Sequence, residues 1–167
     1  MLTPKIYVAC LASYNNGILH GRWIDAFQST DAIFYKIMEI LSESTIEDDQ
    51  EWVIQNYEGF GEIKLSEYED LETIVKYAKI IIEHGELGQA LINNCGLEKA
   101  QVMKDYYLGS YESEVDFAQY LFENYRTINF PESWLCYFDY VAFAHDLFRN
   151  DYFAVEVGDQ THVFYNR

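Results

Sequence analysis

The residues of this chain that could do chemistry are mostly carboxylates, because 28 of its 167 residues are Asp or Glu. Two carboxylates at a defined separation can hydrolyse a glycosidic bond. With so many acidic side chains, almost any pair could be chosen, so the sequence does not single out a catalytic pair. A small hydrolase that uses two carboxylates is therefore the weakest of three functional interpretations.

Metal, phosphate and cofactor sites are also weakly supported. None of the four histidines has a partner histidine one helical turn away, as a helical zinc site would have. The acidic run around Asp48-Asp49 lacks the spacing of a calcium-binding EF-hand loop, which favours a solvated loop. Gly59-Phe60-Gly61 is not followed by the lysine of a phosphate-binding loop. The sequence thus predicts no catalytic residue, no metal and no cofactor.

The amount and distribution of charge are the unusual features of this sequence. The formal net charge is −17, from 28 acidic and 11 basic side chains. Residues 1–61 hold nine acidic and three basic side chains, residues 62–105 nine and five, and residues 106–167 ten and three. A charge of this size repels nucleic acids and anionic membranes and favours a basic partner. Because it is spread along the chain, it suggests a surface that imitates a polyanion.

The cysteines and the apolar runs indicate a cytoplasmic protein. Cys10, Cys95 and Cys136 are odd in number, lie far apart and form no CxxC pair, which suits a reducing compartment. Residues 1–12 lack the apolar run of a signal peptide, and residues 80–82 are too few to span a membrane. We therefore expect no membrane partner.

The elements that must position the carboxylates begin with a β-β-α-β unit. Alternating β-forming residues predict strands at 5–11 and 18–24, joined into a hairpin by a turn at 14–17. A helix is expected after Ser29, with apolar residues on one face, and a further strand at 51–57.

The remainder of the chain predicts mainly helices. One helix should begin at Ser66, with Glu69 reaching back to cap it, and Gly85 and Gly96 should end successive helices. Further helices should begin near 113, 131 and 139, before a hairpin of 152–157 and 161–165. The sequence therefore predicts an α+β fold of three small segments, which are 1–61, 62–105 (a helical bundle) and 106–167. Charge repulsion and three small cores favour an elongated particle.

A series of short motifs follows one order along almost the whole chain, from about residue 6 to 164. They are Ile6-Tyr7-Val8-Ala9, Tyr14-Asn15-Asn16-Gly17, His20-Gly21-Arg22-Trp23-Ile24-Asp25-Ala26, Asn56-Tyr57-Glu58-Gly59-Phe60-Gly61, Ile128 to Glu132, Tyr137-Phe138-Asp139-Tyr140, Phe143-Ala144, Asp146-Leu147, Asp151-Tyr152-Phe153 and His162-Val163-Phe164. In this order, spacing and acidic context, the sequence resembles the ArdA antirestriction protein family. His145 departs from the pattern, because an arginine is expected before Asp146-Leu147.

The resemblance implies a non-enzymatic protein, carried by mobile genetic elements, that mimics duplex DNA. Its carboxylates would stand in place of phosphates in the DNA groove of the specificity and methyltransferase subunits of type I restriction–modification enzymes. The candidate carboxylates are Asp25, Asp31, Glu39, Glu43, Glu47, Asp48, Asp49, Glu58, Glu62, Glu67, Glu69, Asp70, Glu72, Glu112, Glu114, Asp116, Glu123, Glu132, Asp139 and Asp146.

The resemblance also implies a homodimer, for which the candidate contacts are Trp134, Phe138 and Tyr140. The alternative function is that of an acidic inhibitor or regulator of another basic DNA-binding protein, such as a nucleoid protein. No direct contact with nucleic acid is expected in either case, because the net charge opposes it.

Overall fold

The computed structural model describes residues 3–46, 51–126 and 129–166. The candidate residues Glu47, Asp48 and Asp49, and Ile128 of the motif series, lie outside the described residues. The chain divides into two compact units, residues 1–93 and residues 94–167. Each unit combines helices with a small antiparallel sheet, which confirms the predicted α+β class. The three-segment division and the elongated shape stay predictions.

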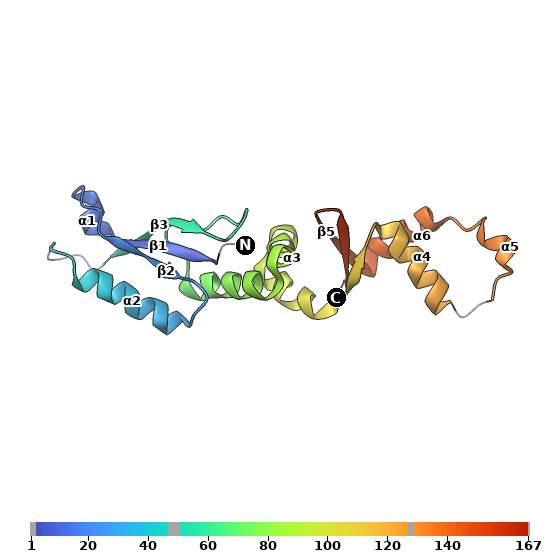
Figure 1. Cartoon of the computed structure of the whole chain (residues 1–167), viewed down its shortest axis with the longest axis horizontal. Helices are drawn as coiled ribbons and strands as arrows, with labels where there is room; N and C mark the ends of the chain where they lie inside the picture. Colours follow the sequence, from blue (N-terminus) through green and yellow to red (C-terminus); the bar gives the residue numbers. More distant parts are fainter. Residues whose placement is uncertain (1–2, 47–50, 127–128, 167) are drawn as a thin grey trace. The chain divides into compact units, whose positions relative to one another are not determined.

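The first unit is built on a three-stranded sheet with the order β2-β1-β3 (Figure 1). Its strands are β1 (Lys5–Cys10), β2 (Gly21–Asp25) and β3 (Trp52–Glu58), and both pairings are antiparallel. With the helix that precedes β3, this confirms the predicted β-β-α-β order.

The predicted tight turn between β1 and β2 is wrong, because a short helix, α1 (Leu11–Asn15), connects these strands. Asn16 explains the difference, since its side-chain amide donates a 2.8 Å hydrogen bond to the carbonyl oxygen of Ala12. Gly17, with φ of 73°, then ends the helix.

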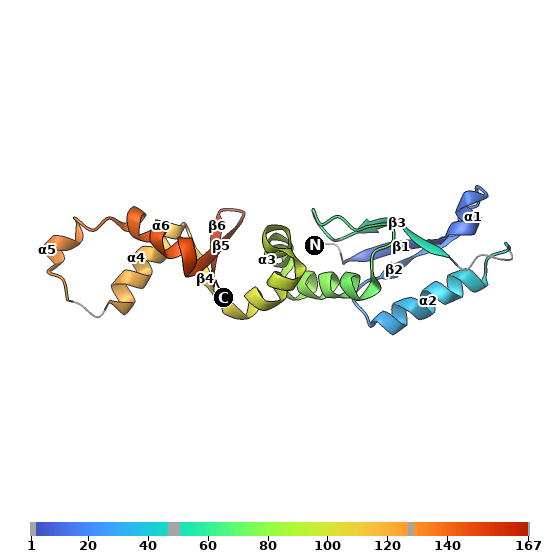
Figure 2. The ribbon, with the colours of Figure 1, turned by 180° about the vertical axis from the view of Figure 1, so that it is seen from behind.

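Two helices cover one face of this sheet, and they lie on the same side of it in both views (Figures 1 and 2). α2 (Thr30–Ser42) begins where the Ser29 hydroxyl accepts a hydrogen bond from the Ala32 amide. Its apolar face is buried as the spacing predicts, through Ile33, Ile37, Ile40 and Leu41. The first turns of α3 (Leu71–Met103) are the second cover, and they bury Leu71, Ile74 and Ala78.

The segment between β3 and α3 corrects the predicted helix start. Glu69 Oε2 accepts from the Ser66 amide at 3.1 Å, as a reciprocal cap would, but α3 begins only at Leu71. There Asp70 Oδ2 accepts from the Thr73 amide at 3.1 Å and acts as the cap. The Ile54 amide of β3 donates to the Glu67 carbonyl at 2.9 Å. This tertiary hydrogen bond holds the segment beside the sheet edge and delays the helix.

Gly59 and Gly61 both have positive φ, 81° and 62°, as expected of glycines that break the chain after β3. A Cβ atom on Gly59 would lie 2.6 Å from the Thr3 carbonyl oxygen, so this position requires glycine. Between the two glycines Phe60 is buried, with its ring edge-on to Tyr57.

α3 is one helical run where the sequence predicts several shorter helices. Gly85 and Gly96 have φ of 60° and 78°, which a regular right-handed helix does not contain. The two glycines expected to end helices are therefore the points at which the run is irregular.

The second unit contains a sheet of order β4-β6-β5, all antiparallel. The strands are β4 (Tyr107–Tyr111), β5 (Tyr152–Val157) and β6 (Gln160–Tyr165), and the last two form the predicted hairpin. β4 follows a 3₁₀ turn, Lys104–Tyr106. This strand was not predicted, because Gly109 and Ser110 interrupt the run of residues with high strand propensity.

Three helices complete the second unit. They are α4 (Glu114–Tyr125), α5 (Glu132–Leu135) and α6 (Tyr140–Asn150). The expected cap of α4 is confirmed, since Ser113 Oγ accepts from the Asp116 amide. α6 begins near residue 139 as predicted, and there Asp139 Oδ1 accepts from the Ala142 amide. The core of this unit is centred on Phe117, Tyr152 and Val163, which lie on α4, β5 and β6.

Candidate partner-binding surface

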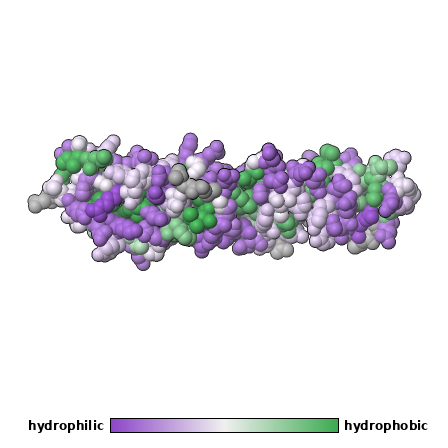
Figure 3. All heavy atoms as spheres, in the orientation of Figure 1, coloured by the Kyte–Doolittle hydropathy of each residue, from purple (hydrophilic) through white to green (hydrophobic). Residues whose placement is uncertain are grey.

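The candidate carboxylates are nearly all accessible to a partner. Three of the twenty lie outside the described residues, and of the remaining seventeen all but Glu58 and Glu69 are exposed. The face of the molecule in Figure 3 is correspondingly dominated by hydrophilic residues, with hydrophobic patches between them.

Some of these carboxylates are neutralised by neighbouring bases. The strand register places Lys5 of β1 between Asp25 of β2 and Glu58 of β3, and Lys5 Nζ lies 3.2 Å from Glu58 Oε1. Glu43, which follows the last residue of α2, pairs with Arg22 of β2, and Glu72 pairs with Lys76 one turn along α3 at 3.9 Å. Exposed pairs of this kind stabilise a fold only weakly.

Other candidates accept hydrogen bonds that shape the backbone. Besides the caps formed by Asp70 and Asp139, Asp25 Oδ1 accepts from the Phe27 amide at 2.8 Å. Asp116 Oδ2 accepts from the Ser113 hydroxyl at 2.6 Å, and Glu123 Oε1 accepts from the Gln119 side chain at 2.8 Å. These side chains have a structural reason to be acidic that is independent of any partner.

A third group of candidates has no such role. Within residues 3–46, 51–126 and 129–166, no ion pair or hydrogen bond engages the carboxylates of eight exposed candidates, here called the unpaired carboxylates. They are Asp31, Glu39, Glu62, Glu67, Glu112, Glu114, Glu132 and Asp146. They occur in both compact units, which agrees with a charge spread along the chain.

The first unit also gathers carboxylates around one open pocket of about 860 Å³. It is lined by Glu69 and Asp70, which precede α3, by Glu72 in the first turn of α3, and by Glu51, which precedes β3. Glu51 is not among the candidates, and the fold brings it to the same pocket as the other three. The aromatic walls of this pocket are Phe34, Trp52 and Tyr68.

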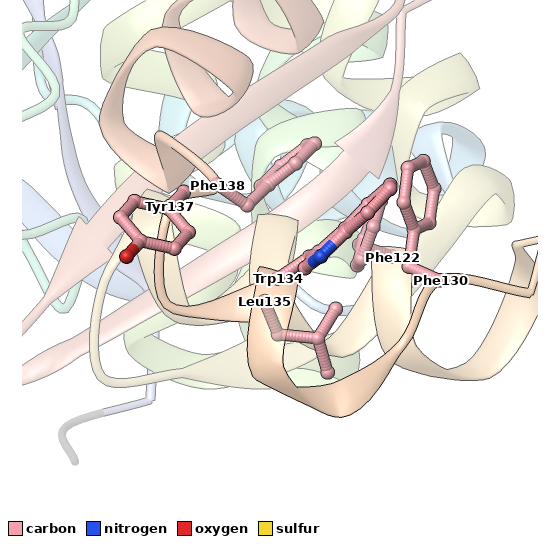
Figure 4. Close-up of a pocket in the computed structure, with 6 residues that line it drawn as sticks. All are labelled: Phe122, Phe130, Trp134, Leu135, Tyr137 and Phe138. Atoms are coloured by element: carbon pink, nitrogen blue, oxygen red, sulfur yellow. The ribbon is translucent and has the colours of Figure 1, made fainter.

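Two of the three predicted dimer contacts share an apolar pocket of about 340 Å³ in the second unit (Figure 4). Trp134 and Phe138 line it with Phe122, and the rings of Phe122 and Phe138 are 4.2 Å apart. Tyr140 lies beside it, with its ring 4.9 Å from that of Phe138. Trp134 is 62% exposed, so this pocket presents a large apolar side chain to solvent.

The described residues show no cluster of three or more His, Cys, Asp or Glu side chains that could hold a metal ion. None of the described helices combines the length and the apolar character needed to cross a membrane.

Comparison with protein families identifies the chain. The model of a family described as antirestriction protein (ArdA) matches residues 6–160. The chain belongs to this family. The match confirms the ArdA resemblance inferred from the order of the motifs, and it covers parts of both compact units. A comparison with curated proteins finds no match to this chain. As an ArdA-family protein, the chain is an antirestriction protein whose exposed carboxylates are its most distinctive surface feature.

Proposed function

We propose that this ArdA-family protein inhibits type I restriction–modification enzymes by occupying the DNA groove of their specificity and methyltransferase subunits. The observation that supports this most directly is that fifteen of the seventeen described candidate carboxylates are exposed, in a chain with a net charge of −17. Such a surface attracts the basic groove of a DNA-binding enzyme and repels DNA itself.

The magnitude of the charge suits a DNA mimic. B-DNA carries one phosphate charge per ~1.7 Å of helix axis, so seventeen charges correspond to roughly eight or nine base pairs. A two-fold dimer would double this length to more than one turn of duplex. The protein would act without catalysis or a cofactor, because occupying the groove is sufficient to exclude the substrate. Its three cysteines are free thiols and form no CxxC pair, which suits action in a reducing cytoplasm.

The salt dependence of binding tests this proposal. Because exposed charges are screened over ~8–10 Å at physiological ionic strength, we expect affinity for a purified type I enzyme to fall roughly tenfold or more as salt is raised from low to physiological concentration. Duplex DNA that carries the recognition sequence should compete with the protein for one site. Fluorescence anisotropy of the labelled protein measures both effects.

The alternative, an inhibitor or regulator of another basic DNA-binding protein, gives a different result in the same experiment. A type I enzyme that binds this protein without competition from DNA, or that does not bind it at low salt, would favour the alternative. A nucleoid protein in place of the enzyme serves as the specificity control.

We also propose that the protein is a homodimer whose contact includes Trp134, Phe138 and Tyr140. The apolar pocket that holds Trp134 and Phe138 supports this contact, because large exposed apolar side chains are typical of interface cores. A two-fold axis would bring the same patch of each copy together.

Removing the indole group should weaken this dimer. We expect Trp134→Ala to raise the dimer dissociation constant roughly 30-fold, since truncation of a central interface residue costs ~2 kcal/mol or more. Sedimentation velocity over a concentration series measures the change. Trp23→Ala, which removes a 44% exposed indole from the first unit, is the matched control. A wild-type protein that is monomeric throughout, or a variant that dimerises normally, contradicts the proposal.

A further inference from the structure

The second unit contains a cavity of about 180 Å³ whose walls are largely aromatic. It lies where α4 meets the sheet, and six rings line it, namely Tyr111, Phe117, Tyr120, Tyr125, Tyr152 and Tyr165. This cavity is separate from the apolar pocket that holds Trp134, since the two have no lining residue in common. No carboxylate lines it in the part of the chain that the structure describes.

The six rings form a continuous series of contacts. The ring centroids of Tyr120 and Tyr125 are 6.3 Å apart, and those of Tyr111 and Tyr120 are 5.6 Å apart. Phe117 continues the series, 5.0 Å from Tyr111 and 4.9 Å from Tyr152. Tyr165 ends it, with its ring 5.3 Å from that of Tyr152. The wall of the cavity therefore comes from β4, α4, β5 and β6.

The cavity has a fixed floor and an accessible rim. Phe117 and Tyr152 are 2% and 9% exposed and belong to the core of the unit, so the core holds their rings in place. Tyr120, Tyr125 and Tyr165 are 43%, 67% and 44% exposed. A ligand could thus enter between the exposed rings without opening the core, and a preorganised floor lowers the entropy cost of binding.

Three of the tyrosines around this cavity, Tyr111, Tyr120 and Tyr152, have a raised pKa. Burial, together with the neighbouring hydroxyl of Tyr165, raises the pKa of Tyr152 to about 12. Burial and the surrounding tyrosines raise the pKa of Tyr111, and a hydrogen bond with Tyr125 raises that of Tyr120. These rings therefore carry no phenolate charge at physiological pH, and the negative quadrupole of an aromatic ring attracts cations.

We propose that this cavity binds a small cation with a quaternary-ammonium headgroup. Several aromatic rings around one cavity are the arrangement that recognises such groups. A primary ammonium is more strongly hydrated than a quaternary one, so it loses more hydration on entering this cavity and fits it less well. Drug-sized ligands occupy pockets of ~300–1,000 Å³, which limits this cavity to a headgroup. The acidic surroundings add long-range attraction, since residues 94–167 hold twelve acidic and five basic side chains.

Choline and its neutral isostere 3,3-dimethylbutan-1-ol provide the test, because they share a shape and differ in charge. The full-length protein with ring-labelled tyrosines is titrated with each compound, and the shifts of the tyrosine ring signals are followed by NMR. We expect choline to bind roughly tenfold more tightly than the isostere, through signals of the cavity tyrosines.

Substitutions separate the ring from the hydroxyl. Tyr120→Leu and Tyr125→Leu each remove one exposed ring and should weaken choline binding severalfold, whereas Tyr120→Phe should keep it. Both positions are exposed, so the fold should survive, and the NMR spectrum reports this directly. Tyr35→Leu, at a 68% exposed tyrosine of α2, is the control and should bind choline as the wild type does.

Two further ligands identify the source of the headgroup. A peptide with trimethyl-lysine that binds as choline does indicates a modified protein side chain, and binding of choline alone indicates a free small molecule. Unmethylated lysine peptide should bind more weakly than either. The proposal is overturned if choline does not bind, or if choline and the isostere bind with equal affinity. It is also overturned if the Tyr120→Leu and Tyr125→Leu variants both bind choline as the wild type does.

Discussion

Simultaneous neutralisation of the eight unpaired carboxylates is expected to abolish inhibition of a type I restriction–modification enzyme, while each single substitution leaves it nearly intact. One exposed charge pair contributes only ~0.2–1 kcal/mol. If the eight contributions add, they amount to roughly 2–8 kcal/mol, which weakens binding by a factor between about 30 and 10⁵ or more. The measurement is a titration of restriction activity against each member of a graded series of Glu→Gln and Asp→Asn variants.

The matched control keeps the charge and changes the side chains. Exchanging Glu for Asp and Asp for Glu at the same eight positions preserves every negative charge, so this variant should inhibit almost as the wild type does. Substitution of these residues should also leave the fold intact, because in the described chain they form no ion pairs and no side-chain hydrogen bonds. Complete loss of inhibition from one well-folded single variant would instead indicate a discrete site, whose members act as a unit.

The second large effect concerns stability. Phe117→Ala should lower the free energy of unfolding of the second unit by ~3–5 kcal/mol, the usual cost of deleting a buried phenylalanine ring. Phe117 is 2% exposed, and its ring lies edge-on to those of Tyr111, Phe148 and Tyr152 at 4.9–5.7 Å. These aromatic pairs add stabilisation beyond the burial of area. Denaturant unfolding followed by near-ultraviolet circular dichroism measures the loss.

Two other variants calibrate this result. Phe117→Leu should cost less, because it leaves a smaller cavity, and Tyr137→Ala, at an 85% exposed position, should stay within ~0.5 kcal/mol of the wild type. Hydrogen exchange resolved by peptide should locate the loss of protection of Phe117→Ala within residues 94–167. Equal destabilisation by Phe117→Ala and Tyr137→Ala would contradict the assignment of Phe117 to the core.

The sequence predicted those features whose hydrogen bonds or periodicity are local. The caps at Ser29 and Ser113 each join a side chain to an amide three residues later, so a few neighbouring residues decide them. The terminal hairpin also depends on adjacent strands and one turn. The class of fold, the exposure of most candidate carboxylates and the ArdA family follow from pattern, composition and motif order over the whole chain.

Tertiary structure alone decided what depends on contacts between distant residues. Helix α3 begins at Leu71 and not at Ser66, because the segment before it is held beside the sheet. The hydrogen bond that holds it runs from the Ile54 amide of β3 to the Glu67 carbonyl. Likewise, the sheet register and the placement of α2 decide that Lys5 neutralises Glu58 and Arg22 neutralises Glu43. The composition gives the number of charged side chains but not which of them form ion pairs. The electrostatic attraction within a pair becomes appreciable only after folding has brought two distant side chains within a few ångströms.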